Sequence, residues 1–259
     1  MAMSSTNTFL ESDKNTINNI IKSYNCSDIY FITGCGNVGD YLIWEGTRTL
    51  LNSLNIKYKE ISISNAYKNR GELCLLCGGG AWCRSYNEFM PLHLPFAESN
   101  FDNVIVLPSS YEVGVDVVRN ALLKSKALFL AREQESYSQI KDICNSKLMH
   151  DHAFYFDYSE YIKDGIGVLN AFRTDPESDR GVIPENNRDI SSLSISLKEW
   201  LNIISDHEII NTDRAHVMIA GAMMKKKVYY RSGNYHKVPE IAKFSLNEFP
   251  VHPLDGNLK

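Results

Sequence analysis

Short hydrophobic runs alternate with longer stretches of helical periodicity along most of this 259-residue chain. Apolar and β-branched residues fill five runs, at positions 29–33, 58–63, 72–77, 104–108 and 127–131. Runs that are apolar at nearly every position are typical of strands buried on both faces of a parallel sheet. Because these runs alternate with helical segments, residues from about 25 to 157 predict one doubly wound α/β unit, preceded by an amphipathic helix at 14–24.

A second, smaller unit is predicted beyond this point. A candidate strand at 165–173 is followed by a polar, proline-containing loop. The pattern then predicts a helix at 196–204, a strand at 207–211, a helix at 214–224 and a strand at 227–232. We therefore expect two domains, residues 1–164 and residues 165–259, of which the second is short for a complete Rossmann-like domain.

Charge and hydropathy exclude several classes of partner. The formal net charge is −4, which argues against binding nucleic acid or an anionic membrane through broad positive charge. The first residues are polar, and no apolar stretch approaches the ~18 residues that span a bilayer. We expect a cytoplasmic protein.

The six cysteines lie mostly within or beside apolar runs. Disulfide frameworks are usual in short secreted chains, so reduced thiols are expected here. Cys74 and Cys77 form a C-x-x-C inside one predicted strand, where both thiols cannot face one metal, and no second pair follows. We interpret this pair as core packing and predict no metal site.

Glycines 34, 36 and 39 follow the first predicted strand with the G-x-G-x-x-G spacing of a dinucleotide-binding turn. Asp40 comes directly after the last glycine, where its carboxylate would compete with a pyrophosphate for the helix N-terminus. Glu60 has the right separation for a ribose-binding acid, but it lies inside a predicted strand. The residues indicate a tight turn with a ligand close to its backbone, and dinucleotide binding stays open as an alternative.

A second turn joins the predicted strand 207–211 to the helix that follows it. Thr212 or Asp213 can cap this helix, which places Arg214 and His216 near its first turn. Backbone N–H groups, a guanidinium and an imidazole then converge at the carboxyl end of a strand, where open α/β sheets bind their ligands. This turn predicts an anion site with a proton donor, and the alternative is a surface arginine beside a packed histidine.

His236 and Lys237 occupy a comparable position after the predicted strand 227–232. They would add positive charge to the same crevice if a βα loop begins there. The alternative is a solvated polar turn.

Six segments, taken in order, resemble the polysaccharide pyruvyl transferase family. They are GCGNVGD (34–40), GGGAW (78–82), AREQES (131–136), HDHAF (150–154), TDRAH (212–216) and NYHK (234–237). The family pattern contains G-N-x-G-D, a later glycine run, R-E-x-x-S, an Asp-containing turn that closes the first domain, and T-x-R-x-H before a helix. Under this resemblance Gly34 produces the dinucleotide spacing by coincidence.

The resemblance implies two Rossmann-like units in a glycosyltransferase-B-like arrangement, with a short second domain and the active site between them. It implies phosphoenolpyruvate as the donor substrate, with no other cofactor. The acceptor would be a sugar of a capsule or exopolysaccharide, or its lipid-linked precursor, and the product a pyruvate ketal. A lipid-linked acceptor would bring the protein to the inner face of the membrane without any insertion signal.

Ketal formation needs a general acid, a general base and several groups that bind anions. With the resemblance, we expect His216 as the acid and Asp151 as the base or as an acceptor-orienting carboxylate. Glu133 is a further catalytic candidate, or else the ion-pair partner of Arg132. The expected donor-binding residues are Arg214, Thr212, His236 and Lys237 on the C-terminal side, together with Arg132. The expected acceptor or cleft residues, on the N-terminal side, are Asn37, Gly39, Asp40, Gly79 and Gly80.

Two other functions remain open at this point. A glycosyltransferase that uses a nucleotide sugar would share the fold class, and a helix N-terminus beside an arginine also suits a diphosphate. A non-catalytic partner in a glycan-assembly complex would bind the acceptor but not the donor.

Overall fold

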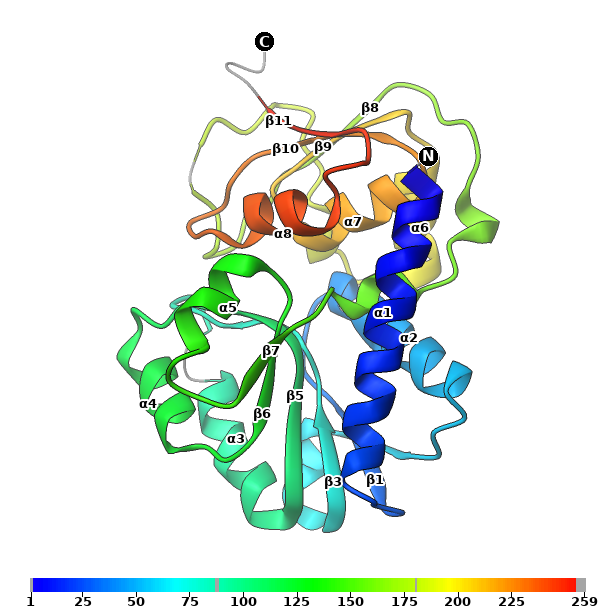
Figure 1. Ribbon diagram of the computed structural model, residues 1–259. Coiled ribbons are helices and arrows are strands. Elements are labelled where there is room, and N and C mark those ends of the chain that lie inside the picture. The colour runs from blue at the N-terminus through cyan, green and yellow to red at the C-terminus, as the bar shows by residue number, and fades with distance from the viewer. Residues whose placement is uncertain (1, 87–88, 180, 255–259) are drawn as a thin grey trace.

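The larger of two β-sheets occupies the N-terminal part of the computed structural model, which describes residues 2–86, 89–179 and 181–254 (Figure 1). Its strands run in the order β2-β1-β3-β5-β6-β7, with β4 paired to β5, and all these pairs are parallel. The strands are β1 (Ile29–Thr33), β2 (Lys59–Ser62), β3 (Gly71–Leu76), β4 (Gly79–Trp82), β5 (Phe101–Tyr111), β6 (Leu128–Ala131) and β7 (Ser146–Leu148).

A smaller parallel sheet has the order β11-β10-β9-β8. Its strands are β8 (Val168–Ala171), β9 (Ile209–Thr212), β10 (Lys227–Tyr230) and β11 (Val251–Pro253). The predicted α/β class is therefore confirmed. All eight predicted runs contain a strand, whereas β4, β7 and β11 were missed.

Helices cover both sheets. They are α1 (Ala2–Ser23), α2 (Val38–Ser53), α3 (Phe89–Asn100), α4 (Asp116–Lys124), α5 (Gln134–Ile140), α6 (Leu197–Ser205), α7 (Ala215–Met223) and α8 (Lys237–Ser245). Short 3-10 turns are η1 (Ile63–Lys68), η2 (His152–Tyr155), η3 (Ser159–Tyr161) and η4 (Ile190–Ser192). No helix within the described ranges has both the length and the hydrophobicity needed to cross a membrane.

Two hydrophobic cores form, one beneath each sheet, and α1 and α2 contribute to both. Ile17 of α1 and Leu50 of α2 are buried in the core of the larger sheet, while Phe9 and Leu42 pack into that of the smaller sheet. Figure 1 shows α1 running along both parts of the molecule. Because α1 and α2 each bury apolar side chains in both cores, the two helices hold the two sheets together on either side of the space between the sheets.

Close backbone approach secures this junction. A Cβ on Gly46 of α2 would lie 1.9 Å from the carbonyl oxygen of His152 in η2, so only glycine fits between these elements.

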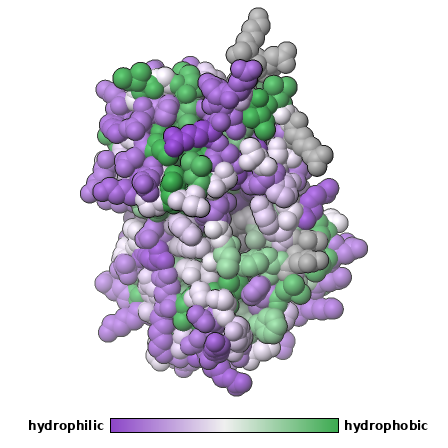
Figure 2. Space-filling view, turned by 180° about the vertical axis from the view of Figure 1, so that it is seen from behind, coloured by the Kyte–Doolittle hydropathy of each residue, from purple (hydrophilic) through white to green (hydrophobic). Residues whose placement is uncertain are grey.

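On the outside of the larger sheet, α3 exposes Leu92 and Phe96 at 57% and 56%. Hydrophobic residues also gather on the lower half of the face in Figure 2.

Candidate active site

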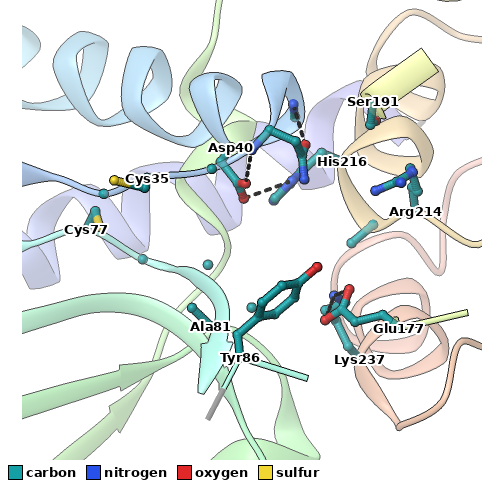
Figure 3. A pocket seen from close by; sticks show the side chains of 18 of the residues that line it. Cys35, Asp40, Cys77, Ala81, Tyr86, Glu177, Ser191, Arg214, His216 and Lys237 are labelled. Atoms are coloured by element: carbon teal, nitrogen blue, oxygen red, sulfur yellow. Dashed lines mark hydrogen bonds and ion pairs between the residues drawn. The ribbon is translucent and has the colours of Figure 1, made fainter. Parts of the chain in front are cut away.

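A cavity of about 440 Å³ lies between the two sheets, at the carboxyl ends of several parallel strands (Figure 3). One wall consists of the β1–α2 turn, the residues after β3 and the start of α3, and the other consists of the segments after β8 and β9 and the start of α8. Pockets that bind small molecules have volumes of about 300–1,000 Å³. The cavity of this protein lies where open α/β folds are expected to bind a ligand.

The glycine turn after β1 ends in a capping box. The Asn37 side chain accepts a hydrogen bond from the Gly39 N–H at 2.8 Å, and Asp40 Oδ2 accepts one from the Asn37 N–H at 2.9 Å. A Cβ on Gly36 would lie 2.3 Å from Asp40 Oδ2, so this glycine makes room for the carboxylate. The carboxylate of Asp40 thus occupies the helix end that a dinucleotide pyrophosphate would need.

His216 lies on the first turn of α7 and lines the cavity opposite the glycine turn that follows β1. Its Nδ1 is 3.9 Å from Asp40 Oδ1, and its Nε2 is 3.3 Å from Arg132 Nη1 and 3.7 Å from Asp151 Oδ2. Because a guanidinium only donates, Nε2 of the neutral ring can accept a hydrogen bond from Arg132, whereas Nε2 of the protonated ring can donate one to Asp151. The protonated ring would have a carboxylate on each side. This environment suits a group that gives up and regains a proton.

Gly39 sets the distance between the imidazole and α2. A Cβ at this position would lie 3.3 Å from both Cβ and Nδ1 of His216, which is tighter than ordinary contact. The glycine that the sequence placed in the cleft therefore lets the histidine approach Asp40.

Asp151 lies behind His216 and is fully buried. Its Oδ2 accepts a hydrogen bond from Arg132 Nη1 at 2.8 Å, and its Oδ1 caps η2 through the Ala153 N–H at 2.8 Å. Burial opposes its ionisation, but hydrogen bonding from His216 and the charge of Arg132 outweigh burial and hold the pKa of Asp151 well below its usual range. The carboxylate orients two groups that line the cavity and is itself absent from the lining.

Arg214 lines the cavity at the N-cap of α7, and neither predicted cap is formed there. Thr212 is buried, where its hydroxyl donates to the Ala171 carbonyl at 2.9 Å and accepts from the Arg214 N–H at 3.0 Å. Asp213 instead accepts a hydrogen bond from the Arg173 N–H at 2.7 Å. Neighbouring backbone groups therefore bind the two side chains that were expected to cap the helix.

Acidic side chains pair with the cations of the cavity, and the sequence interpretation missed them. The Arg214 guanidinium bonds Asp189 through Nε and Nη2 at 2.6 Å each, and Asp175 at 3.0 Å. Arg173 bonds Asp175 at 2.8 Å and also pairs with Glu177. These residues lie in the loop that follows β8, which was interpreted only as a polar connection. Its position after a strand was the available signal.

Lys237 begins α8 and bonds both oxygens of Glu177 at 2.9 Å. Burial lowers the pKa of Lys237, as do the nearby charges of Arg173 and Arg132, while Glu177 opposes this shift. Lys237 therefore lines the cavity, as predicted, although a carboxylate already pairs with it.

Glu133 and His236 lie beside the cavity rather than on its wall. Glu133 is buried at the N-cap of α5, where it accepts from the Ser136 N–H at 2.8 Å and bonds the Ser136 hydroxyl. His236 Nε2 is 3.4 Å from Glu133 Oε1, so Glu133 pairs with this histidine, while Arg132 pairs with Asp151. The expected pairing of Glu133 with Arg132 is corrected accordingly.

Two glycines after β3 bring backbone into the cavity. Gly79 has φ +135°, a conformation that side chains disfavour. A Cβ on Gly80 would lie 3.1 Å from Lys237 Nζ, 3.3 Å from the Tyr235 hydroxyl and 3.4 Å from Arg132 Nη2. Three donor groups thus converge over this glycine.

All six cysteines are free thiols. Cys74 and Cys77 are buried, as expected for core packing, and Cys77 also reaches the cavity, where burial raises its pKa to about 12. Within residues 2–86, 89–179 and 181–254, no group of three potential ligands is arranged to hold a metal.

Comparison with solved structures supports the fold. The crystal structure of a "functional uncharacterized protein KP1_0663" from Klebsiella pneumoniae subsp. pneumoniae NTUH-K2044 superposes with a TM-score of 0.75 at 24% sequence identity. The match covers 92% of this chain and 96% of that chain. A search of curated proteins found no match. Residues 37–234, well over half of the chain, match the sequence profile of Polysaccharide pyruvyl transferase, and the protein therefore belongs to the polysaccharide pyruvyl transferase family.

Proposed function

We propose that this protein transfers the three-carbon pyruvyl unit of phosphoenolpyruvate to a sugar of a surface polysaccharide, or of its lipid-linked precursor, to form a pyruvate ketal. Family membership supports the class of reaction. The observation that carries the donor assignment is the cationic lining of the cavity beside His216, formed by Arg132, Arg173, Arg214 and Lys237. A donor with both a carboxylate and a phosphate needs several such groups.

In the proposed reaction His216 protonates the methylene carbon of the donor, which becomes a methyl group and leaves C2 electron-deficient. A sugar hydroxyl then attacks C2 and loses its proton. A second hydroxyl of the same sugar forms the other C–O bond as phosphate leaves with the C–O bonding electrons. The two new bonds at C2 make the ketal; one of the two hydroxyl protons replaces the proton that His216 gave, and the other leaves with the phosphate.

We assign the base to Asp40 rather than to Asp151. Asp40 lines the cavity, its side chain is 25% exposed, and its Oδ1 faces His216. Asp151 has no exposed surface and its carboxylate is held by Arg132. Its proposed role is to fix the positions of Arg132 and His216.

We further propose that the two sheets correspond to the two Rossmann-like domains of a glycosyltransferase-B-like enzyme, divided between residues 164 and 165. The donor would then bind mainly to the C-terminal side, which contributes Arg173, Arg214 and Lys237. The acceptor would bind mainly to the N-terminal side. A lipid-linked acceptor would bring the protein to the membrane surface.

Calorimetric titration with phosphoenolpyruvate tests the proposal without knowledge of the acceptor. Binding should be lost in Arg214→Ala, weakened in Arg214→Lys, which keeps the charge but not the bidentate fork, and largely retained in His216→Ala. NADH and a uridine-diphosphate sugar serve as control ligands. Failure of the folded wild-type protein to bind phosphoenolpyruvate, with binding of a control ligand instead, would refute the proposal in favour of a nucleotide site.

A further inference from the structure

The cavity is divided between two kinds of surface. The C-terminal wall carries the charged groups of Arg173, Arg214 and Lys237 together with Asp175 and Glu177, whereas the N-terminal wall is largely apolar beside Asn37, Asp40 and Arg132. The apolar lining comprises Trp44, Cys77, Ala81, Phe89 and Met90, with the edge of the wall formed by Tyr86. Figure 3 shows Cys77 and Ala81 on the side opposite Arg214 and Glu177, with Tyr86 between them. Neither the carboxylate nor the phosphate of the proposed donor accounts for the apolar wall.

Resting on the function proposed above, we propose that this wall is the acceptor subsite, in which a pyranose ring stacks on Trp44 and is hydrogen-bonded by Asn37 and Asp40. Trp44 lies one turn of α2 beyond Asp40, is partly buried against the core of the larger sheet and lines the cavity. The C–H groups on one face of a pyranose are complementary to the electron-rich face of an indole ring.

Neighbouring residues fix the position of this ring. Tyr41 packs against Trp44 with the ring centroids 4.8 Å apart. A Cβ on Gly34 would lie 4.0 Å from Trp44 Cζ2, so the turn after β1 presents backbone and not side chain beside the indole. A rigid aromatic surface costs little conformational entropy when a ligand binds.

Polar groups for sugar hydroxyls stand at the edge of the same surface. Asn37 Oδ1 is bound by the Gly39 N–H, which leaves the amide Nδ2 for a ligand. Asp40 Oδ2 is bound by the Asn37 N–H, which leaves Oδ1 directed toward His216 at 3.9 Å. A hydroxyl held by Asp40 Oδ1 would thus lie between the aromatic wall and the proposed proton donor, where the donor carbon must be attacked.

The tryptophans allow a direct test. The chain has three, and the other two, Trp82 and Trp200, are 1% and 0% exposed in the two cores. The whole protein is labelled with 5-fluorotryptophan, and Trp44→Phe assigns the Trp44 ¹⁹F signal. Methyl β-D-glucopyranoside, methyl β-D-galactopyranoside and methyl N-acetyl-β-D-mannosaminide are titrated with and without phosphoenolpyruvate. At least one glycoside should shift the Trp44 signal and leave those of Trp82 and Trp200 unchanged.

A matched pair of variants locates the contact. Trp44→Leu keeps apolar bulk but removes the aromatic face, and should weaken glycoside binding about tenfold with phosphoenolpyruvate binding unchanged. Tyr41→Phe keeps the ring that packs on Trp44, at a position that does not line the cavity, and should leave glycoside binding unchanged. Glycoside binding to these variants is followed by saturation-transfer NMR.

Each remaining outcome decides one of the two proposals. If phosphoenolpyruvate binds and no glycoside shifts the Trp44 signal, or if phosphoenolpyruvate displaces the glycoside competitively, the subsite is refuted and the proposed function stands. If a glycoside shifts Trp44 but phosphoenolpyruvate does not bind, the sugar subsite stands and the proposed donor is wrong.

Discussion

Replacement of Asp175 by asparagine should tighten the binding of phosphoenolpyruvate. Asp175 lines the cavity and bonds Arg173 and Arg214 at 2.8 and 3.0 Å. Burial opposes its ionisation, but the two arginines lower the pKa of Asp175 to about 2, so the carboxylate is charged at neutral pH. An anionic donor that binds these arginines must do so beside this negative charge.

The size of the effect follows from the geometry. A donor oxygen about 3 Å from Arg214, on the side away from Asp175, lies roughly 6 Å from the Asp175 carboxylate. Two unit charges at that distance repel by about 2.8 kcal/mol at an effective dielectric constant of 20, and by about 0.7 kcal/mol at 80. Because the Asp175 side chain is 26% exposed, the repulsion lies between these limits. Asp175→Asn should therefore lower the Kd by roughly threefold to a hundredfold.

Calorimetric titration of wild type and variant with phosphoenolpyruvate measures this change, and urea unfolding reports the stability of each protein. Arg173 retains Glu177 and Arg214 retains Asp189, so the fold should survive the substitution. Asp179→Asn is the matched control, because Asp179 lies in the same loop and pairs with Arg231 outside the cavity. An unchanged or raised Kd in folded Asp175→Asn would show that the donor does not bind at these arginines.

Three further outcomes are expected. Gly39→Ala would place a methyl group 3.3 Å from Nδ1 of His216 and should slow the consumption of phosphoenolpyruvate about 100-fold. Gly114→Ala is the control, because its methyl group would have no atom within 4 Å and should not change the rate. Equal rates for the two variants would refute the positioning role of Gly39. Burial lowers the pKa of His152 to about 4, so between about pH 6.5 and pH 4 the unfolded state binds a proton that the folded state does not, and the free energy of unfolding falls by roughly 1.4 kcal/mol per pH unit as the pH is lowered. His152→Phe should flatten this slope in urea unfolding between pH 7 and 5. An equally steep slope in the variant would show that His152 is not the group responsible. Cys35 is exposed, so Cys35→Ser should remove the fast phase of modification by a thiol reagent, and persistence of that phase would mean that another thiol reacts first.

Local sequence patterns were sufficient for most of the fold. The apolar runs of the sheet interior became strands because burial on both faces requires nearly every side chain to be hydrophobic, whereas β2 lies at the sheet edge with Lys59 and Glu60 exposed. Residues 79–82 form β4 although two of the four are glycines, because β5 supplies the pairing partner. Pairing of this kind depends on the neighbouring strand and has no local signal. The same limit applies to β7 and β11, which have three residues each.

The order of motifs predicted that His216, Arg214, Arg132 and Lys237 belong to one site, and the cavity brings these four together. The order of motifs could not predict which of these side chains line the cavity and which hold the lining residues in place. Asp151 follows β7 and Thr212 ends β9, yet the first is buried behind Arg132 and the second bonds the Ala171 carbonyl. Which side chain faces the cavity depends on packing across the two sheets, which sequence spacing does not contain.

Strand register, however, could have revealed Arg173. In the smaller sheet β8 and β9 are parallel, with Ala171 opposite Thr212, so Arg173 and Arg214 each follow their strand by two residues and emerge side by side. Two adjacent guanidiniums, both nearly buried, require negative partners, and Asp175, Glu177 and Asp189 provide them. The carboxylates that stabilise these cations would therefore also oppose the binding of the proposed donor. For this reason the affinity for phosphoenolpyruvate should be set as much by Asp175 and Glu177 as by the arginines that they hold.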